Sequence, residues 1–427
     1  MKKIGIIGLG YVGLPLALEF GRLNNIEVIG FDINKKRVGE LQKGLDSTNE
    51  HSKKEINSSK NTNFTTDEND LEGLDYYIVT VPTPISNDYK PDYSYLLGAS
   101  KIISKKMKKG SIIVYESTVN PGATEEICVP CLENNSRLVW KRDFNVAYSP
   151  ERLVPGSKTH ILKNIDKLIA GDSDAVRDNV AKLYSKILIS NIIKCSSIKV
   201  AEAAKVIENT QRDLNIAFFN ELSNIFYNLD INTNEVIEAA ATKWNFLKFE
   251  PGLVGGHCLS VDPYYLIDKA KASGYSPQLL ESARNVNENL AANIANRMLN
   301  AVPKKKKRLN VAILGLTYKE DCTDTRNSKA FMLGKILSKN KSYVINVDYI
   351  DHHADYEKVL KEYNVQVQKK INKDSKYDFI IFLSPHKLYK RNHKKILANH
   401  LEKGGVVFDL KNLISKKLSS NYNILKV

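Results

Sequence analysis

The chain has 427 residues, of which 42% are hydrophobic, so its length predicts two or three domains with sizeable cores. No apolar run approaches the roughly 18 residues of a membrane span, so we expect no membrane insertion. The first ten residues combine a charged start with a short apolar run, as a signal peptide does. Glycines and Pro15 follow, however, and a cleavage site of small residues does not. These features predict a cytoplasmic protein.

The net charge of +15 is concentrated in the last third of the chain. Residues 301–427 hold 27 of the 63 lysines and arginines but only 12 of the 48 acidic residues, so the preceding residues are neutral in sum. Such asymmetry is typical of a domain that binds an anionic ligand, a nucleic acid or a membrane surface, and also of a plain lysine-rich face. The run PKKKKR at 303–308 fits a linker into a new domain better than a nucleic-acid patch.

The five cysteines are scattered along the chain, at positions 128, 131, 195, 258 and 322. An odd, scattered set in a long chain is not a disulfide framework. Cys128 and Cys131 form a C-x-x-C pair, but no second ligand pair of the kind that zinc needs lies at a suitable spacing. We therefore expect no metal site.

Short apolar runs alternate with helical patterns in the first part of the chain. Residues 2–10 form an apolar run ending in glycines, residues 10–23 follow a helical pattern, and residues 27–33 form a second strand. Further apolar runs occupy 75–84 and 110–118. Strands that alternate with helices indicate a parallel, doubly wound sheet.

The middle of the chain is helical, and a second strand-rich segment follows it. Residues 196–229 lack glycine and proline and favour helix, which continues to about residue 300 except in a glycine-rich loop at 251–264. Residues 309–319 repeat the strand-then-glycine pattern of the N-terminus, and further strands are expected at 344–351, 378–384 and 404–410. The chain is therefore predicted to be α/β, with two Rossmann-like domains separated by a helical region, and with boundaries at 1–197, 198–302 and 303–427.

Gly8, Gly10 and Gly13 form a G-x-G-x-x-G pattern that follows the first predicted strand and opens a helix. Glycines at this spacing let the backbone turn tightly and approach a pyrophosphate at the helix N-terminus. Asp32 ends the next strand, where a carboxylate bonds a ribose 2′-hydroxyl and repels a 2′-phosphate. The basic residues at 35–37 would tolerate a phosphate, but the acid favours NAD over NADP.

A second glycine pair precedes His257 and Cys258 in the 251–264 loop. These glycines permit a ligand to approach the cysteine closely. A thiolate beside a nicotinamide can form a hemithioacetal with an aldehyde, and loss of hydride then gives a thioester that water hydrolyses. A loop cysteine alone is more often inert, so this prediction depends on the dinucleotide site.

Two further positions carry groups that suit this chemistry. Lys205 and Asn209 lie four residues apart on a predicted helix, so their ammonium and amide groups face one way and can hold an oxyanion. Glu151, in the SPER turn at 149–152, can activate a hydrolytic water. The plain alternatives are an exposed helix lysine and a surface carboxylate.

In this order, these sites resemble those of the UDP-glucose/GDP-mannose dehydrogenase family over essentially the whole chain. The likeness rests on IGLGYVGLPLALEFG, VTVPTP, YESTVNPGATEE, YSPER, KVAEAAKVIENTQRDLNIA, KWNF, PGLVGGHC and VDPYYL taken together. It is greatest for the branch that makes UDP-N-acetylhexosaminuronic acids for capsule and O-antigen polymers, including Vi-antigen-type dehydrogenases. The resemblance implies a cytoplasmic homodimer in which a long central helix and a helical dimer-forming region join an NAD-binding Rossmann domain to a UDP-binding one.

The resemblance also implies a reaction, the oxidation of the C6 alcohol of UDP-GlcNAc or UDP-GalNAc to the uronic acid in two NAD-dependent steps. The implied catalytic residues are Cys258 as nucleophile, Lys205 and Asn209 as the oxyanion pair, Asp262 for proton transfer through water, Glu151 for thioester hydrolysis, and Thr118 beside the hydrolytic water and nicotinamide. The expected NAD contacts are Gly8, Gly10, Tyr11, Val12, Gly13, Asp32, Arg37, Thr83 and Thr118. The expected UDP-sugar contacts are Glu151, Arg152, Lys205, Asn209, Gly255, Gly256, His257, Lys319 and Arg326, with Asp324 orienting Arg326.

Three departures from the family pattern bear on the sugar. UDP-glucose enzymes commonly carry a CFPKD run, whereas here Val261 precedes Asp262, which points toward N-acetylated sugars. Val154 replaces an asparagine that the branch often has, and Glu250 replaces an arginine. The last two bear on the details of sugar recognition.

Other readings of the sequence remain open. UDP-glucose is the alternative substrate. A two-electron dehydrogenase of the 3-hydroxyacid or 6-phosphogluconate type also pairs a Rossmann start with a helical Lys-x-x-x-Asn, but it lacks Cys258 and a domain at 308–427. A basic polymer-binding module would explain the charge, but aromatic stacking platforms are not evident among the basic residues, so no nucleic-acid partner is expected.

Overall fold

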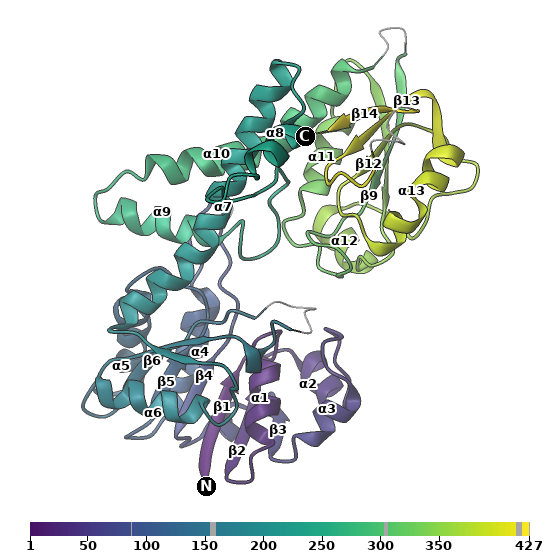
Figure 1. The fold of residues 1–427 in the computed structure, drawn as a ribbon. Helices are drawn as coiled ribbons and strands as arrows, with labels where there is room; N and C mark the ends of the chain where they lie inside the picture. Colours follow the sequence, from purple (N-terminus) through teal and green to yellow (C-terminus); the bar gives the residue numbers. More distant parts are fainter. Residues whose placement is uncertain (87, 154–158, 303–305, 416–420, 427) are drawn as a thin grey trace. The chain divides into compact units, whose positions relative to one another are not determined.

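The computed structural model describes residues 1–86, 88–153, 159–302, 306–415 and 421–426 (Figure 1). The chain forms two compact units, Met1–Glu208 with Tyr264–Ser276, and Asn209–Pro263 with Pro277–Val427. Each unit contains one sheet, and each is described by itself below.

The sheet of the first unit has the strand order β3-β2-β1-β4-β5-β6-β7-β8. Every neighbouring pair is parallel except β6 and β7, which are antiparallel. The strands are β1 (Lys2–Ile7), β2 (Ile26–Phe31), β3 (Thr62–Thr65), β4 (Tyr76–Val79), β5 (Ile112–Tyr115), β6 (Asn145–Tyr148), β7 (Lys167–Gly171) and β8 (Ile192–Lys194). The order reverses between β1 and β4, which is where dinucleotides bind in doubly wound sheets.

The helices of this unit cover both faces of the sheet, so its central strands are apolar throughout. On β4, Tyr76 and Ile78 join one core cluster while Tyr77 and Val79 join the other. The α-helices are α1 (Gly13–Gly21), α2 (Lys35–Gln42), α3 (Lys53–Ser58), α4 (Ser94–Lys106), α5 (Val129–Ser136) and α6 (Asp174–Tyr184). Three short turns are η1 (Glu68–Leu71), η2 (Thr124–Cys128), which is a π-helix, and η3 (Leu162–Asn164).

The sheet of the second unit repeats this topology on a smaller scale, in the order β11-β10-β9-β12-β13-β14, and all its pairs are parallel. Its strands are β9 (Arg308–Leu314), β10 (Val344–Ile350), β11 (Val367–Gln368), β12 (Tyr377–Phe382), β13 (Leu401–Asp409) and β14 (Asn423–Lys426). Its sheet is accompanied by α11 (Lys329–Ser338), α12 (Tyr356–Tyr363) and α13 (Lys387–His400). The strand order reverses between β9 and β12.

Four more helices complete the chain, namely α7 (Ile198–Asn228), α8 (Thr233–Ala240), α9 (Asp262–Ala272) and α10 (Gln278–Asn300). The first turns of α7 belong to the first unit and the rest of it to the second. A buried ion pair joins α7 to α10, with Arg284 Nη1 2.5 Å from Asp213 Oδ1. Leu290, Ile294 and Met298 on α10 pack in one cluster with the strands of the second sheet.

The predicted fold, with two parallel α/β sheets and a long central helix, is confirmed. The antiparallel pairing of β6 with β7 departs from the all-parallel expectation, because the chain returns from Tyr148 to Lys167 without a helical crossover in the described residues. The predicted helix at 10–23 begins only at Gly13, since residues 10–12 form the turn between β1 and α1. Within the described residues, no helix is long and apolar enough to span a membrane.

Candidate functional site

The glycine motif forms the turn from β1 into α1. Gly8 has a φ of +95°, a backbone conformation that residues with a Cβ atom rarely adopt. A Cβ on Gly13 would lie 1.8 Å from Gly8 O, so this glycine permits the close packing of helix and strand. A Cβ on Gly10 would meet no described atom within 4 Å. Gly10 therefore leaves open space beside the helix N-terminus, which fits the pyrophosphate of NAD.

Asp32 follows β2 and is joined to this turn. Its Oδ2 accepts a hydrogen bond from Leu9 N at 2.8 Å, and its Oδ1 accepts one from Asn34 N at 2.8 Å. The carboxylate is only partly buried, so it keeps lone pairs for a ribose hydroxyl. Its position fits the predicted role toward NAD.

Arg37, a predicted cofactor contact, is buried beneath the same turn. Its Nε donates to Leu9 O at 2.9 Å, and its Nη1 lies 2.7 Å from Asp46 Oδ1. The ion pair neutralises the guanidinium, which braces the glycine turn. The exposed Lys35 and Lys36 are therefore the basic residues of 35–37 that remain available to a phosphate.

The loops after β4 and β5 meet beside this turn. Thr83 Oγ1 donates to Thr118 O at 2.7 Å, which links two residues predicted to lie near the cofactor. Tyr265, on α9, donates to Thr83 O at 3.0 Å and so fixes the same loop. Thr80 Oγ1 donates to Gly8 O at 2.7 Å. The predicted cofactor residues of 8–13, 83 and 118 therefore come from connected loops.

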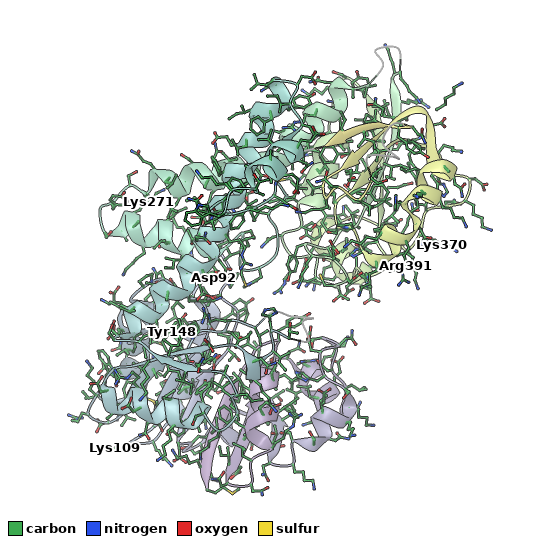
Figure 2. The ribbon with its side chains drawn as sticks, viewed as in Figure 1. Asp92, Lys109, Tyr148, Lys271, Lys370 and Arg391 are labelled. Atoms are coloured by element: carbon green, nitrogen blue, oxygen red, sulfur yellow. The ribbon has the colours of Figure 1, made fainter. Side chains whose placement is uncertain are left out.

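Glu151 and Arg152 follow β6, which ends at Tyr148 (Figure 2). Glu151 Oε1 accepts a hydrogen bond from Arg152 N at 2.6 Å, and Glu151 Oε2 lies 3.4 Å from Lys167 Nζ. Arg152 Nη2 lies 2.8 Å from Glu208 Oε1 on α7. Val154, one of the family departures, is outside the described residues.

Lys205 is on α7 and is only 8% exposed, so it is not the plain surface lysine of the alternative reading. None of the ion pairs among the described residues involves Lys205. Glu202, one turn earlier, accepts hydrogen bonds from Gly122 N at 2.5 Å and Thr124 N at 2.9 Å. These bonds anchor the start of α7 to the loop that follows Thr118.

Three of the predicted catalytic residues are linked within the second unit. Asn209 Nδ2 donates to Asp262 Oδ2 at 2.6 Å, and Asp262 N donates to Cys258 O at 2.8 Å. Cys258 is exposed and Asp262 is buried. An exposed thiol therefore lies one turn before a buried carboxylate at the start of α9.

The glycines before Cys258 pack closely against the segment at 318–327. Gly256 has a φ of +84°, and a Cβ there would lie 2.9 Å from the Tyr318 ring. A Cβ on Gly255 would lie 2.9 Å from Asn327 O. Asn327 Nδ2 also donates to Gly256 O at 3.0 Å. The cysteine loop is thus clamped to the segment at 318–327.

That segment also carries Arg326, whose guanidinium is held by Asp324. Arg326 Nε lies 3.0 Å from both Asp324 oxygens, and Nη2 lies 2.6 Å from Oδ2. Burial lowers the pKa of His257 to about 4, and the positive charge of Arg326 acts in the same direction. His257 is therefore neutral at physiological pH, and Arg326 has the fixed orientation that binding a phosphate requires.

A pocket of about 210 Å³ lies at the carboxyl ends of β9 and β12, where the second sheet reverses its order. It is lined by Gly255, by Lys319, Lys329 and Lys411, and by the N-terminus of α11. Three lysines and a helix N-terminus favour a diphosphate. Other basic residues of this unit, such as Lys370 and Arg391 (Figure 2), are exposed and do not line the pocket.

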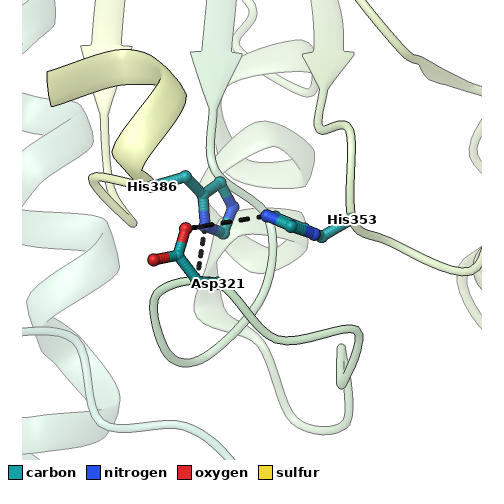
Figure 3. Close-up of side chains that lie close together, drawn as sticks. All are labelled: Asp321, His353 and His386. Atoms are coloured by element: carbon teal, nitrogen blue, oxygen red, sulfur yellow. Dashed lines mark hydrogen bonds and ion pairs between the residues drawn. The ribbon is translucent and has the colours of Figure 1, made fainter. Parts of the chain in front are cut away.

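Asp321, His353 and His386 lie close together beside this pocket's loops (Figure 3), with one potential ligand atom of each within 4.8 Å of the others. His386 Nδ1 accepts a hydrogen bond from Asp321 N at 2.9 Å, and His386 Nε2 lies 2.9 Å from Asp351 Oδ2. Both ring nitrogens are thus engaged. The cluster connects the loops after β9, β10 and β12. With His386 engaged, Asp321 and His353 are the two groups left to bind a metal, and a structural zinc site uses four.

Sequence reasoning missed several residues that hold the site. Lys167, Tyr318 and Asn327 contact predicted site residues that are distant in sequence. No local motif marks them, because their roles arise from tertiary packing. Glu202 was detectable in principle, since it lies one turn before Lys205 on the same helix.

Three family models match successive parts of the chain. They are the NAD binding domain of the UDP-glucose/GDP-mannose dehydrogenase family at residues 2–188, its central domain at 199–289, and its UDP binding domain at 312–416.

Relatives match over nearly the full length. Protein CapL of Staphylococcus aureus is 47% identical, with 97% of this chain and 96% of that protein covered. The UDP-N-acetyl-D-glucosamine 6-dehydrogenase of Salmonella typhi is 43% identical, with 98% and 97% covered. The solved structure of a UDP-D-ManNAc dehydrogenase from Pyrococcus horikoshii has a TM-score of 0.88 at 31% identity, with 100% of this chain and 99% of that one covered. The chain therefore belongs to the UDP-glucose/GDP-mannose dehydrogenase family.

Proposed function

We propose that this chain is a UDP-N-acetylhexosamine 6-dehydrogenase that oxidises the C6 alcohol of UDP-GlcNAc or UDP-GalNAc to the carboxylate. The full-length likeness to a UDP-N-acetyl-D-glucosamine 6-dehydrogenase supports the N-acetylated sugar. Val261 supports it too, because this buried position holds an apolar side chain where UDP-glucose enzymes carry a lysine. A lysine ammonium there would have to be desolvated.

The bond between Asn209 and Asp262, one turn from Cys258, carries the proposal. Gly8, Gly10, Gly13 and Asp32 would hold NAD, which would supply the two-electron oxidant for each of the two oxidations. Cys258 adds to the aldehyde carbon, and the adduct becomes a thioester when it loses hydride. Asn209 and Lys205 stabilise the alkoxide and oxyanions, while Asp262 moves protons through water. Water, activated by Glu151 near Thr118, then releases the acid.

The substrate contacts proposed here lie in both units. Lys319 and Arg326 bind the diphosphate, with Asp324 holding Arg326 in orientation. Gly255, Gly256 and His257 shape the loop beside the sugar, and Arg152 is held by its ion pair with Glu208 on α7. We also propose the domain boundaries at 197 and 302 that the sequence pattern predicts, with the central helical region between them.

The decisive measurement is NADH formation with UDP-GlcNAc, UDP-GalNAc and UDP-glucose in separate reactions. We expect two NADH per sugar consumed, and a higher kcat/KM for an N-acetylated sugar than for UDP-glucose. Preference for UDP-glucose would overturn the substrate, and one NADH with free aldehyde would overturn the thioester route. Cys258→Ser should bind both ligands without completing turnover, and near-normal turnover would remove Cys258 from the nucleophile role.

We further propose a homodimer formed through the helical region of the second unit. Phe218 and Ile225 lie seven residues apart on one face of α7, and both are exposed. Trp244 is 91% exposed and Leu247 is also exposed. Large exposed apolar side chains are typical of an interface. Sedimentation of Phe218→Glu should give a monomer where the parent gives a dimer, and an unchanged mass would reject this surface.

None of the five cysteines, all of which the structure describes, forms a disulfide, which supports a cytoplasmic location because disulfides are rare in that compartment. Fractionation of cells that express the chain tests this proposal. Recovery with periplasmic or secreted proteins would contradict it.

A further inference from the structure

A buried charge network lies behind Glu151 in the first unit. Lys167, at the start of β7, has its Nζ 2.6 Å from Glu116 Oε2, 3.4 Å from Glu151 Oε2 and 3.2 Å from Pro150 O. Tyr184, on α6, donates to Glu116 Oε1. The network therefore joins β7, the end of β5 and helix α6 to the turn that presents Glu151.

The ammonium of Lys167 lies closer to Glu116 than to Glu151. Lys167 and Glu116 are both almost fully buried, whereas Glu151 is partly exposed. Burial alone would lower the pKa of Lys167, but the charges of Glu116 and Glu151 outweigh it and the net shift is upward. The ammonium of Lys167 therefore stays charged. It compensates the buried Glu116 carboxylate and also contacts the Glu151 carboxylate.

Glu151 is fixed at both of its oxygens. Its Oε1 accepts hydrogen bonds from Arg152 N and Leu153 N, and its Oε2 faces Lys167. Among the described residues, the other charged groups that contact this turn are Glu116 and the Arg152–Glu208 ion pair. Since Arg152 is paired with Glu208, Lys167 is the described cation that faces the Glu151 carboxylate.

We propose that Lys167 is a positioning residue for thioester hydrolysis, which holds the Glu151 carboxylate in the orientation that a base needs. The inference rests on the proposed role of Glu151. In that step the water oxygen bonds to the thioester carbonyl carbon and Glu151 takes the water proton. The C–S bond then breaks, the Cys258 thiolate leaves, and the acid is released.

A purely structural role predicts a different outcome. A buried Lys–Glu pair that only supports the sheet would, when removed, destabilise the fold and affect every step alike. A positioning role predicts a selective loss of hydrolysis, with hydride transfer preserved. The two are separable, because hydride transfer precedes hydrolysis and produces the NADH signal.

The test uses the full-length enzyme with NAD and UDP-GlcNAc, mixed rapidly and followed by NADH absorbance. Lys167→Met alone would strand Glu116 in the core and risks unfolding. The test variant is therefore Glu116→Gln/Lys167→Met, and its matched control is Glu116→Gln, which keeps the ammonium beside Glu151. Lys167→Arg checks rescue by a retained charge, and Glu151→Gln checks the base itself.

We expect the double variant to give a burst of two NADH per active site, followed by turnover at least tenfold slower than in Glu116→Gln. Quenched samples should carry the uronyl adduct on Cys258 by intact mass. Lys167→Arg should recover most of the rate.

An equal slowing of burst and turnover, or a change below threefold in their ratio, would overturn the inference about Lys167. If Glu151→Gln hydrolyses the thioester at the normal rate, the proposed role of Glu151 fails instead. Slow hydrolysis in Glu151→Gln with normal hydrolysis in the double variant would reject Lys167 alone.

Discussion

Asn209 donates a hydrogen bond to Asp262 at 2.6 Å, which ties the central helix α7 to the start of α9 one turn after Cys258. Asp262 is 2% exposed, so the bond satisfies a carboxylate that has little access to water. A buried acceptor deprived of its partner costs about 1–3 kcal/mol. The Asn209–Asp262 bond is therefore expected to contribute both to the stability of the fold and to the proposed reaction at Cys258.

We predict that Asn209→Ala lowers the free energy of unfolding by about 1–3 kcal/mol and lowers kcat more than it raises KM for UDP-sugar. The control is Asn215→Ala on the same helix, whose amide donates to Gln211 O four residues earlier. Urea unfolding and steady-state kinetics measure both effects. Equal behaviour of the two variants would mean that the Asn209–Asp262 bond has no special part.

Lys205 gives a prediction about catalysis alone. Its buried ammonium would complement oxygen anions that exist only along the reaction path, so Lys205→Ala should lower kcat by roughly 10²–10³ with little change in UDP-sugar affinity. Lys199→Ala is the matched control, since Lys199 is exposed on the same helix and pairs with Glu126. A loss below about threefold would return Lys205 to an ordinary helix lysine.

Asp32 should set the preference for NAD over NADP. Its carboxylate lies at the end of β2, where it would repel a 2′-phosphate. We expect Asp32→Ala to lower the ratio of kcat/KM for NAD to that for NADP by about tenfold or more, which corresponds to about 1.4 kcal/mol. Asp324→Asn, in the other sheet unit, should leave this ratio unchanged. Equal use of both cofactors by the parent enzyme would rule out this role.

The pKa of His257 gives a pH dependence of stability. Its folded value of about 4 is below the unfolded value of about 6.5, so the unfolded chain binds more protons between these limits. Stability is therefore fully present above pH 6.5 and is lost as pH falls toward 4, by up to about 3 kcal/mol. We predict that His257→Asn loses less stability than the parent between pH 7.5 and 4.5 in urea unfolding. The exposed His160→Asn should follow the parent, and a His257→Asn curve parallel to the parent would contradict the assignment.

The sequence predicted what is local and periodic. The glycine turn, Asp32 and the buried strand β4 are visible because each depends on neighbours a few residues away. The contact of Gly256 with Tyr318 was not predicted, because Tyr318 is 62 residues further along the chain. Lys167 was missed for the same reason, since only the sheet brings it to Glu116 and Glu151. Spacing in one chain does not encode such contacts.

The lopsided charge leads to the last prediction. The whole excess of +15 lies in residues 301–427, and lysines from that segment line the pocket at the end of β9 and β12. A UDP-sugar carries about two negative charges and NAD about one in net, so the basic unit should attract the sugar nucleotide more strongly. Raising the ionic strength from about 0.05 to 0.5 M shortens the Debye length from roughly 14 to 4 Å.

We therefore expect this change in salt to raise KM for UDP-sugar more than KM for NAD, each measured with the other substrate saturating. Lys319→Gln should weaken the salt effect, because this side chain lines the pocket. Lys370→Gln/Arg391→Gln removes two exposed charges that do not line the pocket, and it should leave most of the effect intact because screening limits their reach. Equal shifts in the two KM values would mean that the excess charge serves solubility or another anionic partner. A larger loss in the Lys370/Arg391 variant than in Lys319→Gln would place the attraction away from the pocket.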